Sequence, residues 1–297
     1  MRIQADTVIK YCKRKREIKD FSISLFFVII IITREDVMIL NDIAAEFSKL
    51  NSVNSVVLSG SKTSLINDDM SDYDVYVYSS ESIPLEIRED IIKKFTDKYT
   101  IGNTFFEDGD ELSVAKPKMY IDIMYRNLDW AYKEMDWVWS KHNARLGYTT
   151  AFIHNLKTSK ILYDRNYEFE RIIDELKLPY PEELKQSIID KNYPMLRTLE
   201  GAPYYKQVEL AVKRDDLVSQ NHRTAALLAS YFDILFAYNL QTHPGEKKLI
   251  QYAKKYCKHL PKDFEEDVAS VIKSVGSPQI LQALTKLLDE LDVFLGK

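Results

Sequence analysis

The segment GSKTSLINDDMSDYDVYVY (residues 60–78) decides the fold and the chemistry that we expect of this chain. Just before and within it, the run SVVLSG (residues 55–60) is rich in β-branched residues and ends at glycine, which predicts a short strand. DYDVYVYS (residues 72–79) alternates in character and predicts a second strand. The intervening residues would form a turn that starts at Gly60 and Ser61 and leads to an Asp-x-Asp strand start.

The two aspartates of that strand start are the first candidate site residues. Side chains two residues apart on a strand point to the same face, so Asp72 and Asp74 would present two carboxylates to one point. Like charges at that spacing repel each other and raise a pKa, and a bound divalent cation removes the conflict. Magnesium binds few carboxylates together with phosphate oxygens, so the pair predicts a magnesium site.

The turn before the pair and a later strand supply the remaining candidates. Gly60 permits close approach of the backbone to a phosphate, and the Ser61 hydroxyl and nearby amides can donate hydrogen bonds to it. Lys62 could neutralise phosphate charge, although a solvated surface lysine is the alternative. Asp122 lies in the middle of MYIDIMYR (residues 119–126), where a charge is costly unless it is used. We expect sheet pairing to bring Asp122 beside the Asp72 and Asp74 pair.

This pattern resembles the signature of the DNA polymerase beta-like nucleotidyltransferase superfamily. A strand-ending Gly-Ser, an Asp-x-Asp pair and a later lone Asp build the site in that signature, and here they are Gly60-Ser61, Asp72, Asp74 and Asp122. The segments EDGDE, MYRNLDW, GYTTAFIHN, VSQNHRTAALLASYFDILFA and HPGEKKL are similar to a nucleotidyltransferase-like domain-of-unknown-function family. Leu65 stands where the superfamily often has a second glycine, which leaves the shape of the turn open.

The resemblance implies an enzyme of the nucleotidyltransferase class. It would transfer a nucleoside monophosphate, for which we expect AMP from ATP, to an acceptor hydroxyl. Asp72, Asp74 and Asp122 would be the catalytic metal ligands for two Mg²⁺ ions, and Gly60, Ser61 and Lys62 would bind the triphosphate. A non-catalytic nucleotide-binding or regulatory interaction module of the same fold is the alternative, although such relatives typically lose a carboxylate and this chain keeps all three.

The surrounding pattern predicts an α+β fold in which a mixed sheet with flanking helices precedes an all-helical domain. We expect an N-terminal extension over residues 1–37, a nucleotidyltransferase domain over 38–160 and a helical domain over 161–297. Strand signals end near Asp164, and prolines punctuate the helical segments that follow. The other expected elements are helices over 38–50 and 84–99, strands over 103–108 and 119–126, and a turn over 107–111.

The extension allows three interpretations. A basic run over residues 13–20 precedes the apolar run FSISLFFVIIII (residues 21–32), which is too short for a spanning helix of roughly 20 residues. It could associate with a membrane, form a buried element, or add little to a functional chain that begins near Met38. We favour the last interpretation and expect no membrane association.

The composition limits the kinds of partner and the cellular compartment that we expect. The 41 basic and 45 acidic residues nearly cancel, whereas proteins that grip nucleic acid over a long surface carry a clear basic excess. Only Cys12 and Cys257 occur, which excludes a disulfide framework and favours the cytoplasm. The expected partners are therefore a nucleoside triphosphate and an acceptor, which could be a small antibiotic, a protein side chain or an RNA end. The sequence does not indicate an oligomeric state.

Further segments have a functional and a structural interpretation each. The acidic turn could line the acceptor site or be a solvated hairpin, and His222-Arg223 could face the nucleotide or be a buried histidine and a helix-start arginine. HPGEKK (residues 243–248) could serve the site or merely start a helix. The tryptophans could stack on a base or belong to the core. The residues concerned are Glu107, Asp108, Asp110, Glu111, Asn221, His222, Arg223, Trp130, Trp137 and Trp139.

Overall fold

The computed structural model describes residues 34–63, 71–105 and 107–297, and all of these belong to one compact unit. Leu65, Cys12 and the predicted extension up to residue 33, including the apolar run over 21–32, lie outside the described residues. Among the residues that are described, no helix is both long and apolar enough to span a membrane.

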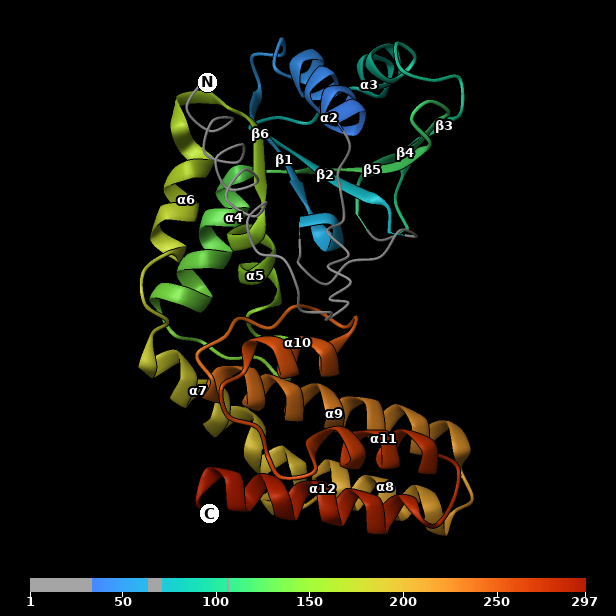
Figure 1. The fold of residues 1–297 in the computed structure, drawn as a ribbon, viewed down its shortest axis with the longest axis vertical. Coiled ribbons are helices and arrows are strands. Elements are labelled where there is room, and N and C mark those ends of the chain that lie inside the picture. Colours follow the sequence, from blue (N-terminus) through green and yellow to red (C-terminus); the bar gives the residue numbers. More distant parts are fainter. Residues whose placement is uncertain (1–33, 64–70, 106) are drawn as a thin grey trace, which may run out of the picture. The chain divides into compact units, whose positions relative to one another are not determined.

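A mixed sheet forms the first half of the described chain, as predicted (Figure 1). Within the described residues its strands run in the order β3-β4-β5-β2-β1-β6. The strands β2 and β5 pair in parallel, and every other neighbouring pair is antiparallel. The strands are β1 (Val53–Ser59), β2 (Tyr73–Ser79), β3 (Tyr99–Asn103), β4 (Gly109–Val114), β5 (Met119–Arg126) and β6 (Lys160–Asp164).

Helices cover both faces of the sheet, and strand alternation divides the core between them. Val75 and Val77 of β2 pack with helices α2 (Arg34–Phe47) and α3 (Leu85–Ile92). Tyr76 and Tyr78 point to the opposite face, where α4 (Leu128–Met135), α5 (Ala151–Thr158) and α6 (Glu168–Leu176) cover the sheet (Figure 1). Asp74 shares the face of Tyr76, so its carboxylate lies on the side of α5.

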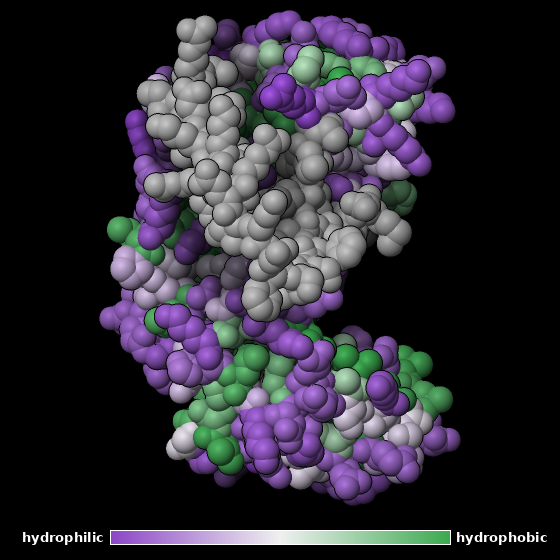
Figure 2. Space-filling model, in the orientation of Figure 1, coloured by the Kyte–Doolittle hydropathy of each residue, from purple (hydrophilic) through white to green (hydrophobic). Residues whose placement is uncertain are grey.

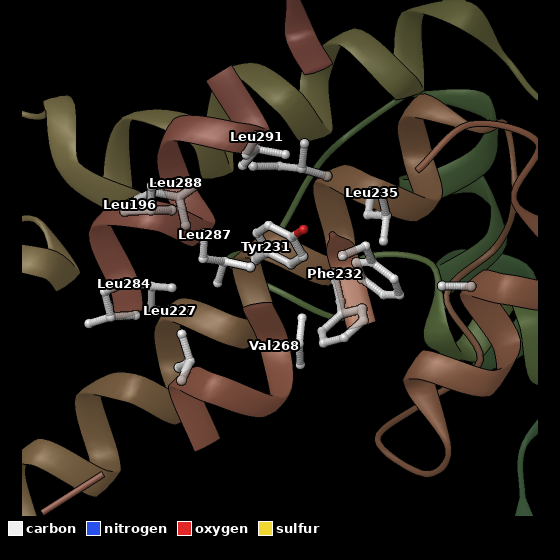
Figure 3. Packing of buried hydrophobic residues seen from close by; sticks show 14 of the residues in the cluster. Leu196, Leu227, Tyr231, Phe232, Leu235, Val268, Leu284, Leu287, Leu288 and Leu291 are labelled. Atoms are coloured by element: carbon white, nitrogen blue, oxygen red, sulfur yellow. The ribbon is translucent and has the colours of Figure 1, made fainter. Parts of the chain in front are cut away.

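The second half of the chain is helical from Arg165 onward, which confirms the predicted order of sheet and helices. Its core joins the long helix α9 to α11 and α12 through leucines, Tyr231 and Phe232 (Figure 3). Figure 2 shows that apolar residues also reach the surface of this half among hydrophilic ones. The helices are α7 (Glu182–Tyr193), α8 (Tyr204–Lys213), α9 (Leu217–Tyr238), α10 (Leu249–Tyr256), α11 (Phe264–Ser274) and α12 (Ile280–Leu295).

Several predicted boundaries are wrong, mostly around the acidic turn. The helix predicted over 84–99 ends at Ile92, and the strand predicted over 103–108 ends at Asn103 as β3. The predicted turn over 107–111 contains the start of an unpredicted strand, β4, and β6 was also not predicted. Acidic residues and glycine disfavour strands locally, but pairing with β3 and β5 outweighs that preference in β4.

The first described helix starts before Met38. Asp36 in its first turn is buried, and its Oδ2 accepts a hydrogen bond of 2.9 Å from the Tyr73 hydroxyl at the start of β2. The packed structure therefore begins within the region that we assigned to the N-terminal extension.

A buried carboxylate links the two halves of the chain. Asp233 of α9 is 1% exposed and accepts hydrogen bonds from the backbone N–H and the hydroxyl of Thr149, the latter at 2.7 Å. The Asn192 amide of α7 lies 3.4 Å from the same carboxylate. Burial raises the pKa of Asp233 to about 7, which outweighs the opposite effect of these donors.

Asp233 should make the stability of the protein depend on pH. The carboxyl group titrates near 3.8 when exposed and near 7 in the fold, so the folded state binds the proton more tightly. Its contribution is full below about pH 4 and is lost as the pH rises toward 7. We predict that the unfolding free energy of the wild type, relative to Asp233→Asn, falls by an amount on the order of 3 kcal/mol across that range.

Chemical denaturation at several pH values measures this difference. Asp190→Asn on the exposed face of α7 is the control, because its difference from the wild type should not vary in the same way. A constant difference between the wild type and Asp233→Asn would contradict the prediction.

Candidate active site

Strand register places the predicted aspartates together. In the parallel pair of β2 and β5, Asp74 is the direct partner of Asp122, so both carboxylates lie side by side on one face of the sheet. Asp72 lies two residues before Asp74, just outside β2, and is exposed. On the other side of β5, Glu111 of β4 is the antiparallel partner of Asp122. We call Asp74, Asp122 and Glu111 the carboxylate row.

The charges of these groups act on one another. Burial, together with the negative charges of Asp122 and Asp72, raises the pKa of Asp74 to about 6 against the opposing effect of the positive charge of Lys247. Burial, followed by the charges of Asp72 and Glu111, raises the pKa of Asp122. The site thus gathers negative charge around two partly buried carboxylates, which favours a cation.

Gly60 permits the closest contact of the site. The strand β1 ends at Ser59, the register partner of Asp74, and a 3₁₀ turn follows over Gly60–Thr63. Gly60 adopts φ +66°, and a Cβ atom at this position would lie 1.8 Å from Oδ2 of Asp74. The Ser61 N–H donates a hydrogen bond to Asp74, so this amide serves the carboxylate as well as the turn. The tight turn and Asp74 are therefore one packed unit.

Lys62 does not line the cavity that Gly60 and Ser61 line. It is 7% exposed, and its Nζ sits 5.0 Å from the centre of the Tyr73 ring. It does not belong to the residues that line either cavity beside the carboxylates. Its contact with Tyr73 is that of a residue that holds the turn onto β2.

Two cavities flank the carboxylate row. The first, which we call the lysine cavity, has a volume of about 280 Å³ and is lined by Gly60, Ser61 and Asp74 on one side and by Lys247 and Lys248 on another. The second, which we call the tyrosine cavity, measures about 660 Å³ and is lined by Asp72, Glu111, Asp122, Lys98, Tyr99 and Tyr120 together with neighbouring residues. Asp74 therefore lines one cavity, and Asp122 and Glu111 line the other.

The donor set suits a hard cation, although it is not a closed cage. Among the described residues, no group of three or more His, Cys, Asp or Glu side chains converges in a way that could hold a metal ion by itself. Magnesium requires no such cage, because it binds through one or two carboxylates and takes its other ligands from water and phosphate oxygens. Asp74 and Asp122, with Asp72 adjacent, supply that partial set.

The predicted acidic turn divides into structural residues and one site residue. Asp108 pairs with the buried guanidinium of Arg88 at 2.7 Å, and Glu107 pairs with Arg126 at 2.6 Å. Asp110 is buried and accepts hydrogen bonds from Gly102 N–H and the Tyr125 hydroxyl. Glu107 and Asp108 are exposed, in keeping with the solvated-hairpin interpretation, although both form ion pairs. Asp110 is buried and fits neither interpretation. Glu111 alone faces the tyrosine cavity.

The other candidates lie away from the carboxylates. His222 is exposed on α9, so the buried interpretation is wrong, and neither it nor Arg223 lines the two cavities. Trp139 belongs to the core, whereas Trp130 and Trp137 are 45% and 37% exposed. None of the three tryptophans lines either cavity.

Helices α5 and α10 contribute cavity residues that were not predicted as site residues. His154, Asn155 and Thr158 of α5 and Tyr252 of α10 line the lysine cavity. Burial lowers the pKa of His154 to about 4, so its imidazole is neutral at physiological pH, and Nδ1 lies 2.8 Å from the Thr242 hydroxyl. His154 and Asn155 lie in GYTTAFIHN, one of the segments that carry the family resemblance, but that resemblance assigned neither residue a role.

Comparison with known proteins gives fold likenesses at low identity. No family model and no curated protein sequence matches the chain. A nucleotidyltransferase-like protein from Exiguobacterium sibiricum is 10% identical with a TM-score of 0.41, over 88% of this chain and 74% of the other. Spectinomycin adenyltransferase from Enterococcus faecialis, solved with ATP and spectinomycin, is 14% identical with a TM-score of 0.27, over 84% and 98%. The Thermotoga maritima CCA-adding enzyme complexed with tRNA is 11% identical with a TM-score of 0.24, over 87% and 74%.

Gly60→Ala tests the contact between the turn and the aspartate. The new methyl group overlaps Oδ2 of Asp74, so the carboxylate must move by an ångström or more. We predict that any magnesium-dependent activity falls on the order of 100-fold, because misplacement at that scale has this effect. The positive φ alone adds a folding cost of about 1 kcal/mol.

Gly296→Ala is the matched control for backbone strain. Gly296 adopts φ +70° with no atom within 4 Å of an added Cβ, so it carries a similar backbone cost without the clash. Equal activity of the two variants in a nucleotidyl-transfer assay would show that the Gly60–Asp74 contact does not matter.

Proposed function

We propose that this protein is a metal-dependent nucleotidyltransferase that transfers AMP from ATP to an acceptor hydroxyl. The observation that supports this most strongly is the parallel register of Asp74 and Asp122 beside the Gly60-Ser61 turn. This proposal assigns a role to two adjacent carboxylates whose mutual repulsion would otherwise only destabilise the sheet. We place the reaction in the cytoplasm, in keeping with the low cysteine content.

The carboxylates would hold the metal ions. Asp72 and Asp74 would bind the magnesium of the nucleotide, and Asp122 would help to hold a second ion on the acceptor side. Bound magnesium would neutralise phosphate charge and lower the pKa of the acceptor hydroxyl. The Gly60-Ser61 turn, with the Ser61 hydroxyl, would hold the β- and γ-phosphates beside Asp74, in the lysine cavity.

The reaction is an in-line displacement at the α-phosphorus. The acceptor oxygen forms a bond to phosphorus while the bond to the oxygen that bridges the α- and β-phosphates breaks, and pyrophosphate leaves. The acceptor hydroxyl gives its proton to solvent water, so the products are the adenylylated acceptor, pyrophosphate and a proton. Because the lysine cavity lies on the Asp74 side, the acceptor would approach Asp122 from the tyrosine cavity, whose lining includes Glu111.

Asp72→Ala combined with Asp74→Ala tests the catalytic proposal. We predict that the wild type, incubated with magnesium, each of four labelled nucleoside triphosphates and cell-extract or small-molecule acceptors, gives a labelled product, most of it from ATP. The double variant should lose at least about 100-fold of this activity, because it loses groups that stabilise charge in the transition state. Chelation of magnesium should have the same effect.

Asp190→Ala, at an exposed position on α7, is the control for general effects of removing a carboxylate. Undiminished transfer by the double variant would refute the assigned roles of the aspartates. Magnesium-dependent binding of ATP without transfer to any acceptor would instead support the non-catalytic alternative.

A further inference from the structure

The turn over residues 243–248, between α9 and α10, is held in place by contacts of the buried His243. His243 is fully buried, and its N–H donates a 2.8 Å hydrogen bond to the Thr150 hydroxyl. Its ring packs between Tyr148 and Phe236, with centres 4.8 and 5.1 Å away. These contacts fix one end of the turn to the segment that leads into α5.

The histidine also fixes the shape of the turn. Its Nδ1 accepts a 3.1 Å hydrogen bond from Gly245 N–H, which requires a neutral ring with an unprotonated Nδ1. Burial lowers the pKa of His243 to about 3, in agreement with that state. Gly245 (φ +97°) and Lys248 (φ +56°) both adopt left-handed conformations, so the chain reverses sharply around Glu246 and Lys247.

This turn forms one wall of the lysine cavity, opposite the Gly60-Ser61 turn. Residues 244–248 line the cavity together with Gly60, Ser61 and Asp74. Lys247 is close enough for its positive charge to act on Asp74, where it is the largest opposing influence on that carboxylate. The lining of this cavity therefore includes a carboxylate, which can share a cation with a phosphate, and a lysine, which can bind a phosphate directly.

We propose that Lys247 binds the polyphosphate tail of the donor nucleotide, so that the helical half of the chain completes the donor site. This inference rests on the proposed function, which places the α-phosphate at the carboxylate row. The β- and γ-phosphates then extend from the row along the cavity toward residues 244–248. A lysine ammonium is a point charge that phosphate oxygens accept without strict geometry, which suits an exposed side chain on a rigid turn.

Lys247→Ala tests the proposal through binding rather than turnover. Magnesium-ATP should bind at least about tenfold more weakly to this variant, because a charge-assisted hydrogen bond is lost. Inorganic triphosphate should lose a similar factor as a competitor, whereas adenosine should bind unchanged. Lys247→Arg should retain most of the affinity, and Lys262→Ala, an exposed lysine elsewhere, should match the wild type.

The outcomes separate this inference from the proposed function. If the wild type binds magnesium-ATP and Lys247→Ala binds it equally well, the role of Lys247 is refuted while the proposed function stands. If the wild type binds no nucleoside triphosphate, the proposed function fails, and this inference fails with it. Equal weakening of adenosine and ATP would also refute the role, because it would indicate a general disturbance of the cavity.

Gly245→Ala tests whether the shape of the turn positions the lysine. An added Cβ meets no atom within 4 Å, so the substitution strains the backbone without a clash. We expect a several-fold loss of affinity for magnesium-ATP and a melting temperature close to that of Gly201→Ala, whose glycine has φ +106° in equally open space. An unchanged affinity would contradict the positioning role of the turn.

Discussion

The parallel pairing of β2 with β5 is the constraint on which the rest of the site depends. It sets Asp74 directly against Asp122, and the antiparallel pairing of β4 extends the contact to Glu111. Like charges on neighbouring strands destabilise a sheet, and burial makes this repulsion stronger. Burial is the main cause of the raised pKa values of Asp74 and Asp122, and the charges of the neighbouring carboxylates add to it. A cation between these strands would convert the same repulsion into binding energy.

The elements around the carboxylate row are shaped by the position of Asp74. Gly60 leaves room for the Asp74 carboxylate, and the Ser61 N–H donates to it, so the end of β1 is shaped by a residue of β2. The lysine cavity then needs a wall on its far side, and the helical half supplies it through residues 244–248. Asp233 and Thr149 tie α9 to the segment before α5, while His243 and Thr150 tie the turn to the same segment. The proposed donor site is thus held by both halves of the chain.

The sequence predicts a strand or a site residue correctly where the signal lies within a short segment. Apolar alternation and the Asp-x-Asp pattern predict β1, β2 and β5, and a charge within an apolar strand identifies Asp122. The sequence does not predict an element or a residue's position that depends on contacts between residues far apart in the chain. The strand β4 begins with Gly109 and Asp110, and the buried Asp110 carboxylate is stabilised there by hydrogen bonds from Gly102 N–H and the Tyr125 hydroxyl and by the Arg88 guanidinium. Lys247 looks like a solvated lysine until His243 is seen to anchor its turn to Thr150, 93 residues earlier in the chain.

The central claim is that the carboxylates of β2 and β5 share a metal ion with the phosphates of a nucleotide. Anomalous diffraction from a crystal grown with Mn²⁺ and a non-hydrolysable ATP analogue tests it most directly. We expect an anomalous peak between Asp74 and the α-phosphate, with metal–oxygen distances close to the ~2.1 Å of small hard cations. A fully occupied nucleotide whose metal contacts none of Asp72, Asp74 and Asp122 would contradict it.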